Sequence, residues 1–381
     1  MDITIEIVRS ASRLGEIGAA WQALWTRCGA DIFQGHGWLH AWASGEASEA
    51  LRIGIAWRDE TLVAAFPCAI RRQHGLRQLE WAAQTASDYC DAMVDPAEPP
   101  LPVLISLWQA IRAAGGFDLI RLRQVRPDAR VRRLLDADIA ESGHLRQDLD
   151  EVPCMRIDRQ WADGRTFFRD LTKKQRNNHT RGKRILGELA GEVVFRIHDP
   201  SEPLSPVLDR ILELKRAWLR IHDPASSMLG SGAATHRAML EAAWRSGIMT
   251  VFLLEAGDRL AAASLNFVYE GKMQAYLTSY DPAFERASPG TILIVEYAMW
   301  AFDHGIESVD LMRGSEAFKT RMTNAVTMLN GYAGACTLPG HAALLLRDLR
   351  SRWRRTGTQQ RDDGREPDTR DAHAPESLTS A

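Results

Sequence analysis

Apolar and polar positions follow the same order in the two halves of the sequence. In the first half, a strand is predicted at residues 52–57 and, after a polar turn, a returning strand at 62–70. In the second half, the same pattern predicts strands at 250–255 and 260–269, again separated by a short polar turn. We therefore expect each half of the chain to contain a β-hairpin.

Each predicted hairpin is followed by a further strand, a long apolar helix and a final strand. The helices are predicted at 101–114 and 291–303, and glycine, which commonly ends helices, follows both of them. The final strands are predicted at 117–123 and 308–312. This repeated order of helices, antiparallel strands, a long helix and a strand predicts two α/β domains of one topology.

The length of the chain also favours two domains, because 381 residues exceed what one ordinary core holds. We expect an N-terminal domain at 1–157, a C-terminal domain at 158–345 and a disordered tail at 346–381, where mixed charges accompany Gly, Pro, Ser and Thr. Residues 158–171 are expected to cross between the domains, and a basic helix is predicted at 172–190.

The composition predicts a soluble globular protein, with 45% hydrophobic residues, 25% charged residues and a net charge of -2. Its apolar stretches are shorter than the roughly 20 residues of a membrane-spanning helix, and the N-terminus lacks a signal-peptide pattern. The five cysteines are odd in number and scattered, which argues against a disulfide framework and a zinc site. His36 and His40 have no acidic or cysteine partner nearby in sequence, so we expect no metal. The prediction is a cytoplasmic protein without membrane insertion.

The sequence Ser288-Pro289-Gly290-Thr291 begins the second long helix and predicts an anion-binding turn. Ser288 is a preferred N-cap residue, Pro289 suits the first helical position and Gly290 allows a ligand to approach the backbone. Free N–H groups at Gly290 and Thr291, at the positive end of the helix dipole, would bind a phosphate or pyrophosphate, and Arg286 would add charge. An ordinary capped helix start is the alternative. The corresponding place in the first half is acidic and rich in proline, so only the second half is expected to bind an anion.

Short motifs recur through both halves in a defined order and spacing. The motifs of the first half are Phe33-Gln34, Trp38, Trp42, Pro67, Ser87-Asp88-Tyr89 and Asp91. The motifs of the second half are Lys173-Lys174-Gln175-Arg176-Asn177-Asn178, Tyr280-Asp281-Pro282, Ser288-Pro289-Gly290, Gly305, Asp310-Leu311-Met312-Arg313-Gly314 and Lys319. Over roughly residues 15 to 335 the chain resembles the GNAT superfamily of acyltransferases, and more closely its CelD-like branch, which is related to the Fem-type tandem GNAT proteins.

The resemblance implies two tandem GNAT-like domains, each a mostly antiparallel central sheet flanked by helices. It implies that acetyl-CoA or another acyl-CoA binds to the second domain, and that the acyl group passes directly to an amine, such as an amino sugar, in a ternary complex. Because several members are associated with cell-surface polysaccharides, a small-molecule or glycan amine is the expected partner, not a nucleic acid. Two alternatives stay open: a Fem-type transferase whose donor is charged tRNA, and a non-catalytic assembly module of a polysaccharide synthesis system.

Acyl transfer to an amine requires a base for the amine and an acid for the departing thiolate. Asp310, on an otherwise apolar strand, is the first candidate carboxylate, with a structural hydrogen bond to Arg313 as the alternative. Tyr280 or Tyr276 would supply a phenol, unless both only pack on the core. Lys319 would act on a phosphate or on the tetrahedral oxyanion, with a solvated surface lysine as the alternative.

Two features leave roles open. The resemblance implies a tyrosine acid after the final strand, but the residue before Lys319 is Phe318, so the sequence does not assign the acid. The basic helix at 172–190 would engage CoA phosphates, an anionic glycan precursor or nucleic acid, or would only present a solvated face. Its lack of interleaved aromatic residues weakens the nucleic-acid interpretation.

Overall fold

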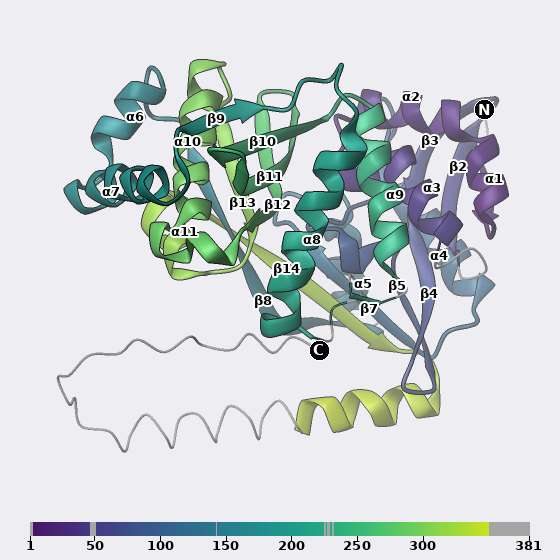
Figure 1. The fold of residues 1–381 in the computed structure, drawn as a ribbon. Helices are drawn as coiled ribbons and strands as arrows, with labels where there is room; N and C mark the ends of the chain where they lie inside the picture. The colour runs from purple at the N-terminus through teal and green to yellow at the C-terminus, as the bar shows by residue number, and fades with distance from the viewer. Residues whose placement is uncertain are drawn as a thin grey trace. The chain divides into compact units, whose positions relative to one another are not determined.

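The computed structural model describes residues 3–45, 51–141, 143–224, 226, 229–230 and 232–349 (Figure 1). Contacts within the chain define two compact units that are discontinuous in sequence, whereas the sequence predicts contiguous domains. The described residues of the first unit are 3–34, 51–141, 143–151 and 330–349, and those of the second are 35–45, 152–224, 226, 229–230 and 232–329. The reason for the discontinuity is local, because α3 (His36–Gly45) packs on α9 (Gly232–Arg245) inside the second unit.

The first unit combines short strands with helices on their faces. Its strands are β1 (Ile3–Val8), β2 (Ile53–Arg58), β3 (Thr61–Phe66), β4 (Cys68–Gln73), β5 (Leu76–Trp81), β6 (Met93–Val94) and β7 (Leu119–Val125). Its helices are α1 (Ala11–Glu16), α2 (Gly18–Cys28), η1 (Ile32–Gln34), η2 (Gln84–Ala86), α4 (Pro100–Ala114), α5 (Arg132–Glu141) and a helix at 338–349. Two strands, β8 (Leu145–Asp158) and β14 (Ala325–Ala335), run from one unit into the other.

The hairpin predicted in the first half is confirmed, since β2 and β3 pair antiparallel up to Arg58 and Thr61. The prediction of one continuous returning strand at 62–70 is wrong, because the structure has two strands there. Pro67 divides the predicted strand into β3, which joins the order β1-β2-β3-β6, and β4, which pairs with β5 in a different sheet. Proline has no N–H to donate to a sheet ladder, so the strand breaks there.

The second unit has long strands and longer helices. Its strands are β9 (Val193–Ile197), β10 (Met249–Ala256), β11 (Arg259–Tyr269), β12 (Lys272–Tyr280) and β13 (Ser308–Arg313). Its helices, besides α3 and α9, are α6 (Gly164–Asp170), α7 (Lys173–Ala190), α8 (Leu204–His222), η4 (Pro282–Ala287), α10 (Pro289–Asp303) and α11 (Ala317–Met322).

The sheet of the second unit has the order β9-β10-β11-β12-β13-β8. The predicted hairpin is confirmed, because β10 and β11 pair antiparallel up to Ala256 and Arg259. By contrast, β12 and β13 are parallel, and α10 lies between them in the chain. A parallel pair needs such a crossover helix, and the helix N-terminus then lies just after the first strand of the pair.

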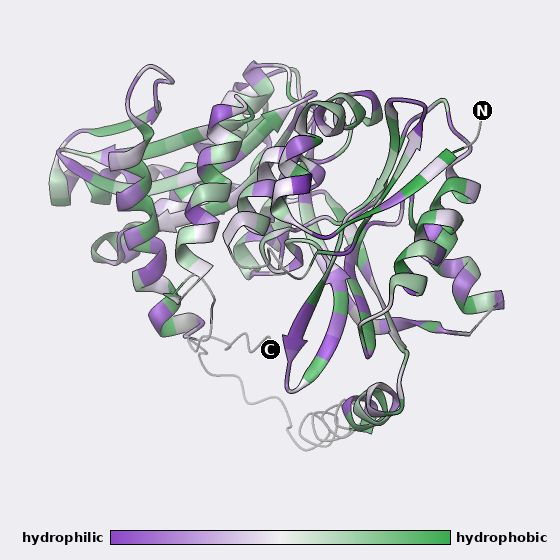
Figure 2. Ribbon diagram, turned by 90° about the vertical axis from the view of Figure 1, so that its right-hand side faces the viewer, coloured by the Kyte–Doolittle hydropathy of each residue, from purple (hydrophilic) through white to green (hydrophobic). Residues whose placement is uncertain are grey.

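Helices cover both faces of this sheet. On one side α6 and α7 pack on α10, and α10 packs on β10, β11 and β12 (Figure 1). Elsewhere α8 packs on β12, and α9 packs on β10. The helices carry both hydrophobic and hydrophilic residues (Figure 2). The central strands are instead buried along most of their length, as in β11, where residues 261–267 are all buried, because both faces of the sheet are covered.

The structure corrects two further expectations. The segment predicted to cross between domains, 158–171, instead contains α6, whose Phe167 is buried in the core of the second unit. Part of the predicted tail is ordered, because residues 346–349 belong to the helix at 338–349, where Arg347 pairs with Asp148 at 3.1 Å. The rest of the predicted tail, 350–381, lies outside the described residues.

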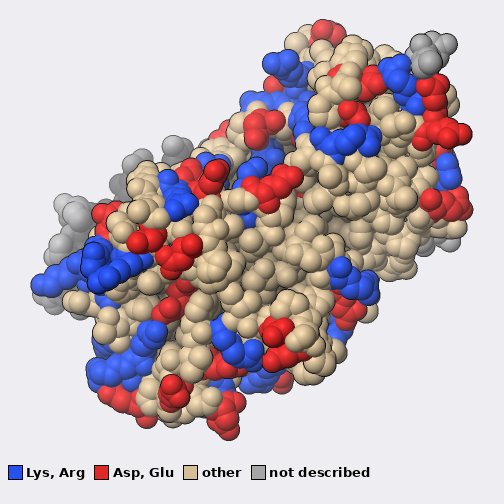
Figure 3. Space-filling view, turned by 90° about the horizontal axis from the view of Figure 1, so that it is seen from above, with Lys and Arg blue, Asp and Glu red and all other residues tan. Residues whose placement is uncertain are grey.

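On the face shown in Figure 3, acidic and basic side chains are interspersed and do not form one broad patch of a single sign. This distribution agrees with the net charge of -2. Over the part of the chain that the structure describes, no helix combines the length and the apolar character needed to cross a bilayer.

Candidate functional site

The candidate site of the second unit lies where the pairing of β12 with β13 ends. Their parallel pairing ends at Gln274 and Asp310, but β12 continues to Tyr280. Beyond that point the backbone groups on this edge of β12 have no ladder partner in β13, and exposed backbone groups of this kind seek another partner. A β-bulge in the β11–β12 pairing falls here, since Leu265 pairs with Leu277 and Asn266 pairs with Ala275. The bulge leaves Tyr276 as the extra residue, and bulges commonly redirect a side chain.

The turn between β12 and α10 contains a short helix, η4, that the sequence does not predict. Asp281 caps η4 by accepting a hydrogen bond from the Ala283 N–H at 2.9 Å, and Pro282 occupies the first helical position. The Asp281 carboxylate also accepts a bond of 2.8 Å from Arg259. These contacts explain why Tyr280-Asp281-Pro282 forms a motif, because Asp281 fixes the loop that leads to α10.

The predicted anion-binding turn is only partly as expected. Ser288 stands at the N-cap position of α10, but its side chain makes no capping hydrogen bond, because its backbone is left-handed with φ 54°. The Thr291 amide is not free, since it donates to the Ser288 carbonyl at 3.0 Å. Among the described residues, the Gly290 N–H has no hydrogen-bond partner. The turn therefore offers one unsatisfied amide, and not two, at the positive end of α10.

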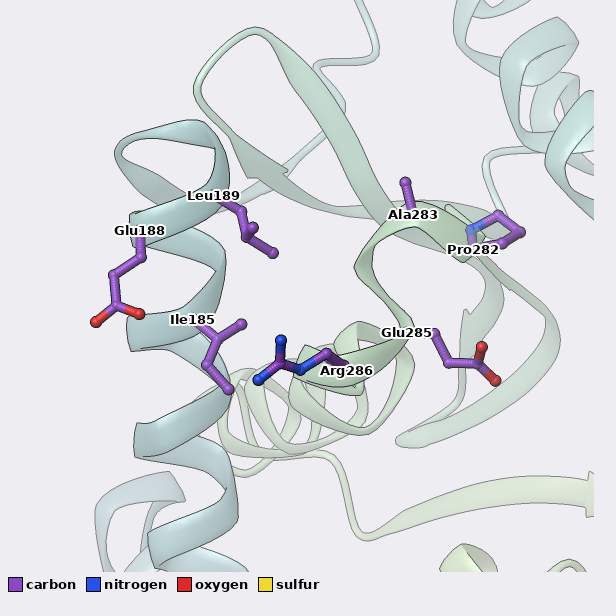
Figure 4. Close-up of a pocket in the computed structure, with 7 residues that line it drawn as sticks. All are labelled: Ile185, Glu188, Leu189, Pro282, Ala283, Glu285 and Arg286. Atoms are coloured by element: carbon purple, nitrogen blue, oxygen red, sulfur yellow. The ribbon is translucent and has the colours of Figure 1, made fainter.

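Arg286 lies beside this turn, on the wall of a hollow of about 370 Å³ between α7 and η4 (Figure 4). The guanidinium points towards α7, while the carboxylates of Glu188 and Glu285 point away from the hollow (Figure 4). Arg286 forms no ion pair with any described residue. The remaining walls are mostly apolar: Ile185, Leu189, Pro282 and Ala283. The hollow thus combines one cation with apolar walls, which suits a ligand that has both a planar apolar part and an anionic group.

Asp310 is buried, with 8% of its surface exposed, as its place on an apolar strand predicts. One carboxylate oxygen accepts a hydrogen bond of 2.8 Å from the Met312 N–H. Met312 has a left-handed backbone with φ 60°, and the pairing of β13 with β8 shifts register between Asp310 and Arg313. The carboxylate therefore holds an irregular turn at the end of β13, where Gly314 also has a positive φ of 115°.

Lys319 is buried at 8% exposure, so its interpretation as a solvated surface lysine is wrong. Its Nζ donates to the Arg313 carbonyl at 2.6 Å and lies 3.1 Å from a Glu316 carboxylate oxygen. Lys319 thereby connects α11 to Arg313, the last residue of β13, which lies three positions after Asp310. Its charge is partly compensated by Glu316.

Tyr280 is half-buried at the end of β12, close to the anion-binding turn. A Cβ added at Gly290 would lie 3.7 Å from Cδ1 of Tyr280. Burial raises the pKa of the Tyr280 phenol, and the negative charge of Glu285 raises it further, so the phenol stays protonated at neutral pH. Within the described residues no hydrogen bond joins Tyr280 to Asp310 or Lys319. The predicted site residues thus form two groups, Tyr280 with 286–291 and Asp310 with Lys319.

Sequence reasoning missed a third group on the other side of β12. His236 of α9 is buried, and its Nε2 lies 2.8 Å from the Tyr276 hydroxyl. Burial, and secondarily the charge of Lys215 on α8, lower the pKa of His236 to about 4. No motif marks this pair, because the two residues lie 40 positions apart and meet only through the packing of α9.

The basic helix α7 begins with the capping box of Thr172 and Gln175 and packs on α10. Two of its basic residues point at α10. His179 Nε2 lies 3.0 Å from the Glu296 carboxylate, and Lys183 Nζ lies 2.8 Å from the same oxygen. The solvated-face interpretation therefore does not hold for the whole helix, because these side chains fix it to the helix that begins at the anion-binding turn.

We expect Glu296→Gln to lower the free energy of unfolding by about 1–2 kcal/mol at pH 7, because it removes charge-assisted hydrogen bonds. Burial raises the pKa of Glu296, but hydrogen bonds from His179 and Lys183 outweigh burial, so that the pKa lies below its ordinary 4.5. A lowered folded-state pKa stabilises the protein above the unfolded-state value, and this stabilisation is lost as the pH falls. The difference in the free energy of unfolding between the wild type and Glu296→Gln should therefore be constant above about pH 5 and shrink below pH 4.5. Urea unfolding at several pH values measures it.

Glu188→Gln on α7 is the matched control. Glu188 pairs with Arg184, but both side chains are exposed, so we expect a change of about 0.5 kcal/mol or less. An equal loss in both variants would show that the Glu296 contacts contribute nothing specific.

Most motif residues of the first half lie in the first unit, whereas Trp38 and Trp42 belong to α3 of the second unit. The contacts of those in the first unit are structural. The Gln34 side chain donates to the Tyr89 carbonyl at 3.0 Å, and the rings of Phe33 and Tyr89 meet edge to face. Asp91 accepts hydrogen bonds from the N–H groups of Arg130 and Val131 at 2.9 and 3.0 Å. Over the described residues, no three His, Cys, Asp or Glu side chains form a group that could hold a metal ion.

Comparison with known proteins finds a similarity within the second unit. Residues 173–320 match the family described as acetyltransferase (GNAT) domain, and this segment runs from α7 to α11. The matched segment of the second unit is thus similar to a GNAT acetyltransferase domain, and it includes the β12–α10–β13 crossover and the turn at 286–291. No curated protein matches the sequence.

Solved structures extend the similarity to most of the chain. FemX has a TM-score of 0.56 at 12% identity, covering 89% of this chain and 98% of FemX. The C-terminal domain (DUF2156) of a putative lysylphosphatidylglycerol synthetase from Agrobacterium fabrum has a TM-score of 0.53 at 14% identity, covering 88% of this chain and 96% of that one. A tandem GNAT protein from the clavulanic acid biosynthesis pathway has a TM-score of 0.48 at 11% identity, covering 88% and 99%. At these identities the first two show the fold alone, a mixed α/β fold of sheets flanked by helices.

Proposed function

We propose that this protein transfers an acyl group, most simply acetyl, from an acyl-CoA to an amine. One observation carries the proposal. The segment that matches a GNAT acetyltransferase domain contains α10. Among the described residues, the Gly290 amide at the N-terminus of α10 has no hydrogen-bond partner, and the nearby Arg286 forms no ion pair. An amide at a helix N-terminus and a nearby guanidinium are the groups that bind phosphate in proteins.

In this proposal the pyrophosphate of the CoA binds at Gly290. Ser288, Pro289 and Thr291 surround that amide, and Ser288 and Thr291 have hydroxyl groups that can donate to phosphate oxygens. Arg286 supplies positive charge from the adjacent hollow, whose apolar walls accept a planar base. The pantetheine arm then follows the edge of β12 that has no ladder partner in β13.

The proposed chemistry uses the residues around the end of that edge. Asp310 is the candidate base for the amine, although it already accepts from Met312 through one oxygen. Tyr280, whose phenol stays protonated, is a candidate donor to the leaving sulfur. Lys319 would act through its charge on the oxyanion or on a phosphate. These roles remain predictions for substitution experiments.

The proposal also includes the branch of the superfamily, the domain that binds the donor, the cellular location and the acceptor. We place the chain in the CelD-like branch, with its donor site in a C-terminal domain at 158–345 and its action in the cytoplasm. The acceptor would be an amino sugar or a similar amine used in cell-surface polysaccharide production. The resemblance of the motifs in both halves supports these points.

The test is a product assay with acetyl-CoA and a panel of amines that begins with glucosamine, read by mass spectrometry. Appearance of an N-acetylated amine, dependent on the protein, would support the proposal. Consumption of charged tRNA with no use of any acyl-CoA would favour the Fem-type alternative. Assembly with polysaccharide enzymes without any transfer would favour a non-catalytic role.

A further inference from the structure

The helix at 338–349, drawn in yellow in Figure 1, is fixed to the first unit by the side on which Gly340 and Arg347 lie. A Cβ added at Gly340 would collide with the Asp118 carbonyl oxygen, so the helix approaches the backbone of the first unit closely at this point. Two turns later, the Arg347 guanidinium pairs with the Asp148 carboxylate at 3.1 Å. These contacts determine which side of the helix faces outward.

The outward side of this helix is apolar. Leu345, Leu346 and Leu349 are 64%, 56% and 58% exposed, and Leu338 at the start of the helix is 87% exposed. Ala342 is also exposed and lies three positions before Leu345, which places it on the same side of the helix. Single exposed leucines are common on protein surfaces, but a row of them on one helix indicates an interaction surface.

The charges next to the leucines indicate what this surface binds. Asp348 is the only carboxylate in the sequence of the helix, and it accepts a hydrogen bond of 2.7 Å from Arg146. The sequence continues after Leu349 with arginine at positions 350, 352, 354 and 355 and with Trp353. Exposed leucines beside arginines and a tryptophan are typical of helices that bind the surface of an anionic membrane.

A second copy of the chain fits this surface less well. It would cover the leucines, but its helix would offer the arginines no free acidic partner, because Asp348 is already engaged with Arg146. Positive charges brought together without opposite charges disfavour an interface. An anionic lipid surface provides both interactions, since its headgroups attract the arginines and its acyl chains accept the leucines.

We propose that the helix at 338–349 attaches the protein to the surface of an anionic membrane, with Leu345, Leu346 and Leu349 at the boundary of the acyl chains. The helix lies along the membrane and does not cross it. The attachment is reversible, because three leucines bury only a small apolar area. This inference goes beyond the proposed transfer reaction and does not depend on it, since the helix belongs to the first unit and the candidate site to the second.

Flotation of the full-length protein with lipid vesicles tests the attachment. The wild type should bind vesicles of phosphatidylcholine that contain about 30 mol% phosphatidylserine, and should bind pure phosphatidylcholine roughly ten-fold more weakly or less. Raising the salt from about 0.1 M to about 0.5 M should weaken the binding, because salt screens the arginines. Replacing the arginines at 350, 352, 354 and 355 with glutamine should have the same effect.

The leucines are tested by the combined variant Leu345→Gln, Leu346→Gln and Leu349→Gln. It should bind the anionic vesicles about ten-fold more weakly or less than the wild type, because it removes apolar contacts without changing the charge. Glutamine is a good helix former, so the melting temperature should stay unchanged. The matched control combines Ile221→Gln with Val326→Thr, two residues that are 75% and 53% exposed elsewhere, and should bind as the wild type does.

Three results would overturn the proposal. The first is a wild type that does not bind anionic vesicles at low salt. The second is binding that the leucine variant retains in full, or that the control loses to the same extent, since the leucines would then have no specific part. The third is sedimentation in which the wild type is a dimer and the leucine variant a monomer, which would make a second copy the partner. None of these results would affect a transfer activity measured without vesicles.

Discussion

Replacing Gly290 with leucine is expected to reduce acetyl-CoA binding by at least 100-fold, on the order of 3 kcal/mol, while the second unit stays folded. The leucine side chain would occupy the space in front of the Gly290 amide, where the proposal places the pyrophosphate. The fold should tolerate the change, because a Cβ here meets Tyr280 at 3.7 Å, an ordinary contact, and the residue lies in the first turn of α10. Calorimetry measures the affinity, and thermal unfolding checks the fold.

Gly290→Ala is the graded control. It adds only the Cβ, so we expect an affinity between that of the wild type and that of Gly290→Leu, with an unchanged melting temperature. Wild-type affinity in Gly290→Leu would mean that the donor does not use this amide.

Gly182→Ala is expected to lower the free energy of unfolding by about 2 kcal/mol and to weaken acetyl-CoA binding as well. A Cβ at Gly182 would lie 2.5 Å from the Ala287 carbonyl oxygen and 2.8 Å from Cδ1 of Ile292. The first of these atoms is backbone and cannot rotate away, so α7 or the loop carrying Arg286 and Ser288 must move. Urea unfolding gives the stability, and calorimetry gives the affinity.

Gly187→Ala on the same helix separates packing from helix propensity. A Cβ at Gly187 has no atom within 4 Å, so this change should stabilise the protein by up to about 1 kcal/mol. If Gly182→Ala behaved like Gly187→Ala, the close approach of α7 to the loop would have no energetic significance.

The sequence predicts those parts of the fold that depend on local periodicity. Both hairpins and both long helices are confirmed, and α4 and α10 begin at Pro100 and Pro289 within two residues of the predicted starts. Glycine at 305 ends α10 with a positive φ of 76°, as a helix C-terminus commonly requires. For these elements, the spacing of hydrophobic residues and the residues at the ends of each element suffice for prediction. The reason is that the interactions that fix each element lie within it.

The parts that the sequence does not predict depend on contacts between distant segments. The predicted cap at Ser288 fails because η4, held by Asp281 and Arg259, delivers the chain to α10 in a left-handed conformation. The position of α3 in the second unit follows from its packing on α9, and nothing in residues 36–45 indicates that partner. The same holds for His236, since only the packing of α9 brings it to Tyr276.

The candidate site shows the same division. The turn at 288–291 is visible in sequence because proline and glycine have local consequences, although within the described part of the chain only its Gly290 amide lacks a hydrogen-bond partner. Lys319 and Asp310 are visible as polar residues in apolar surroundings, but their partners, the Arg313 carbonyl and the Met312 amide, follow from the bulge at the end of β13. Backbone irregularities of this kind have no strong signature in one sequence.

The measurement that tests the central claim most directly is calorimetry of acetyl-CoA, and of longer acyl-CoAs, with the wild-type protein. We expect binding in the micromolar range, about −8 kcal/mol, as is typical of an enzyme donor substrate. The loss of that binding in Gly290→Leu would place the donor at the N-terminus of α10. Absence of binding to every acyl-CoA at millimolar concentration would contradict the account and leave charged tRNA, or no donor at all, as the alternatives.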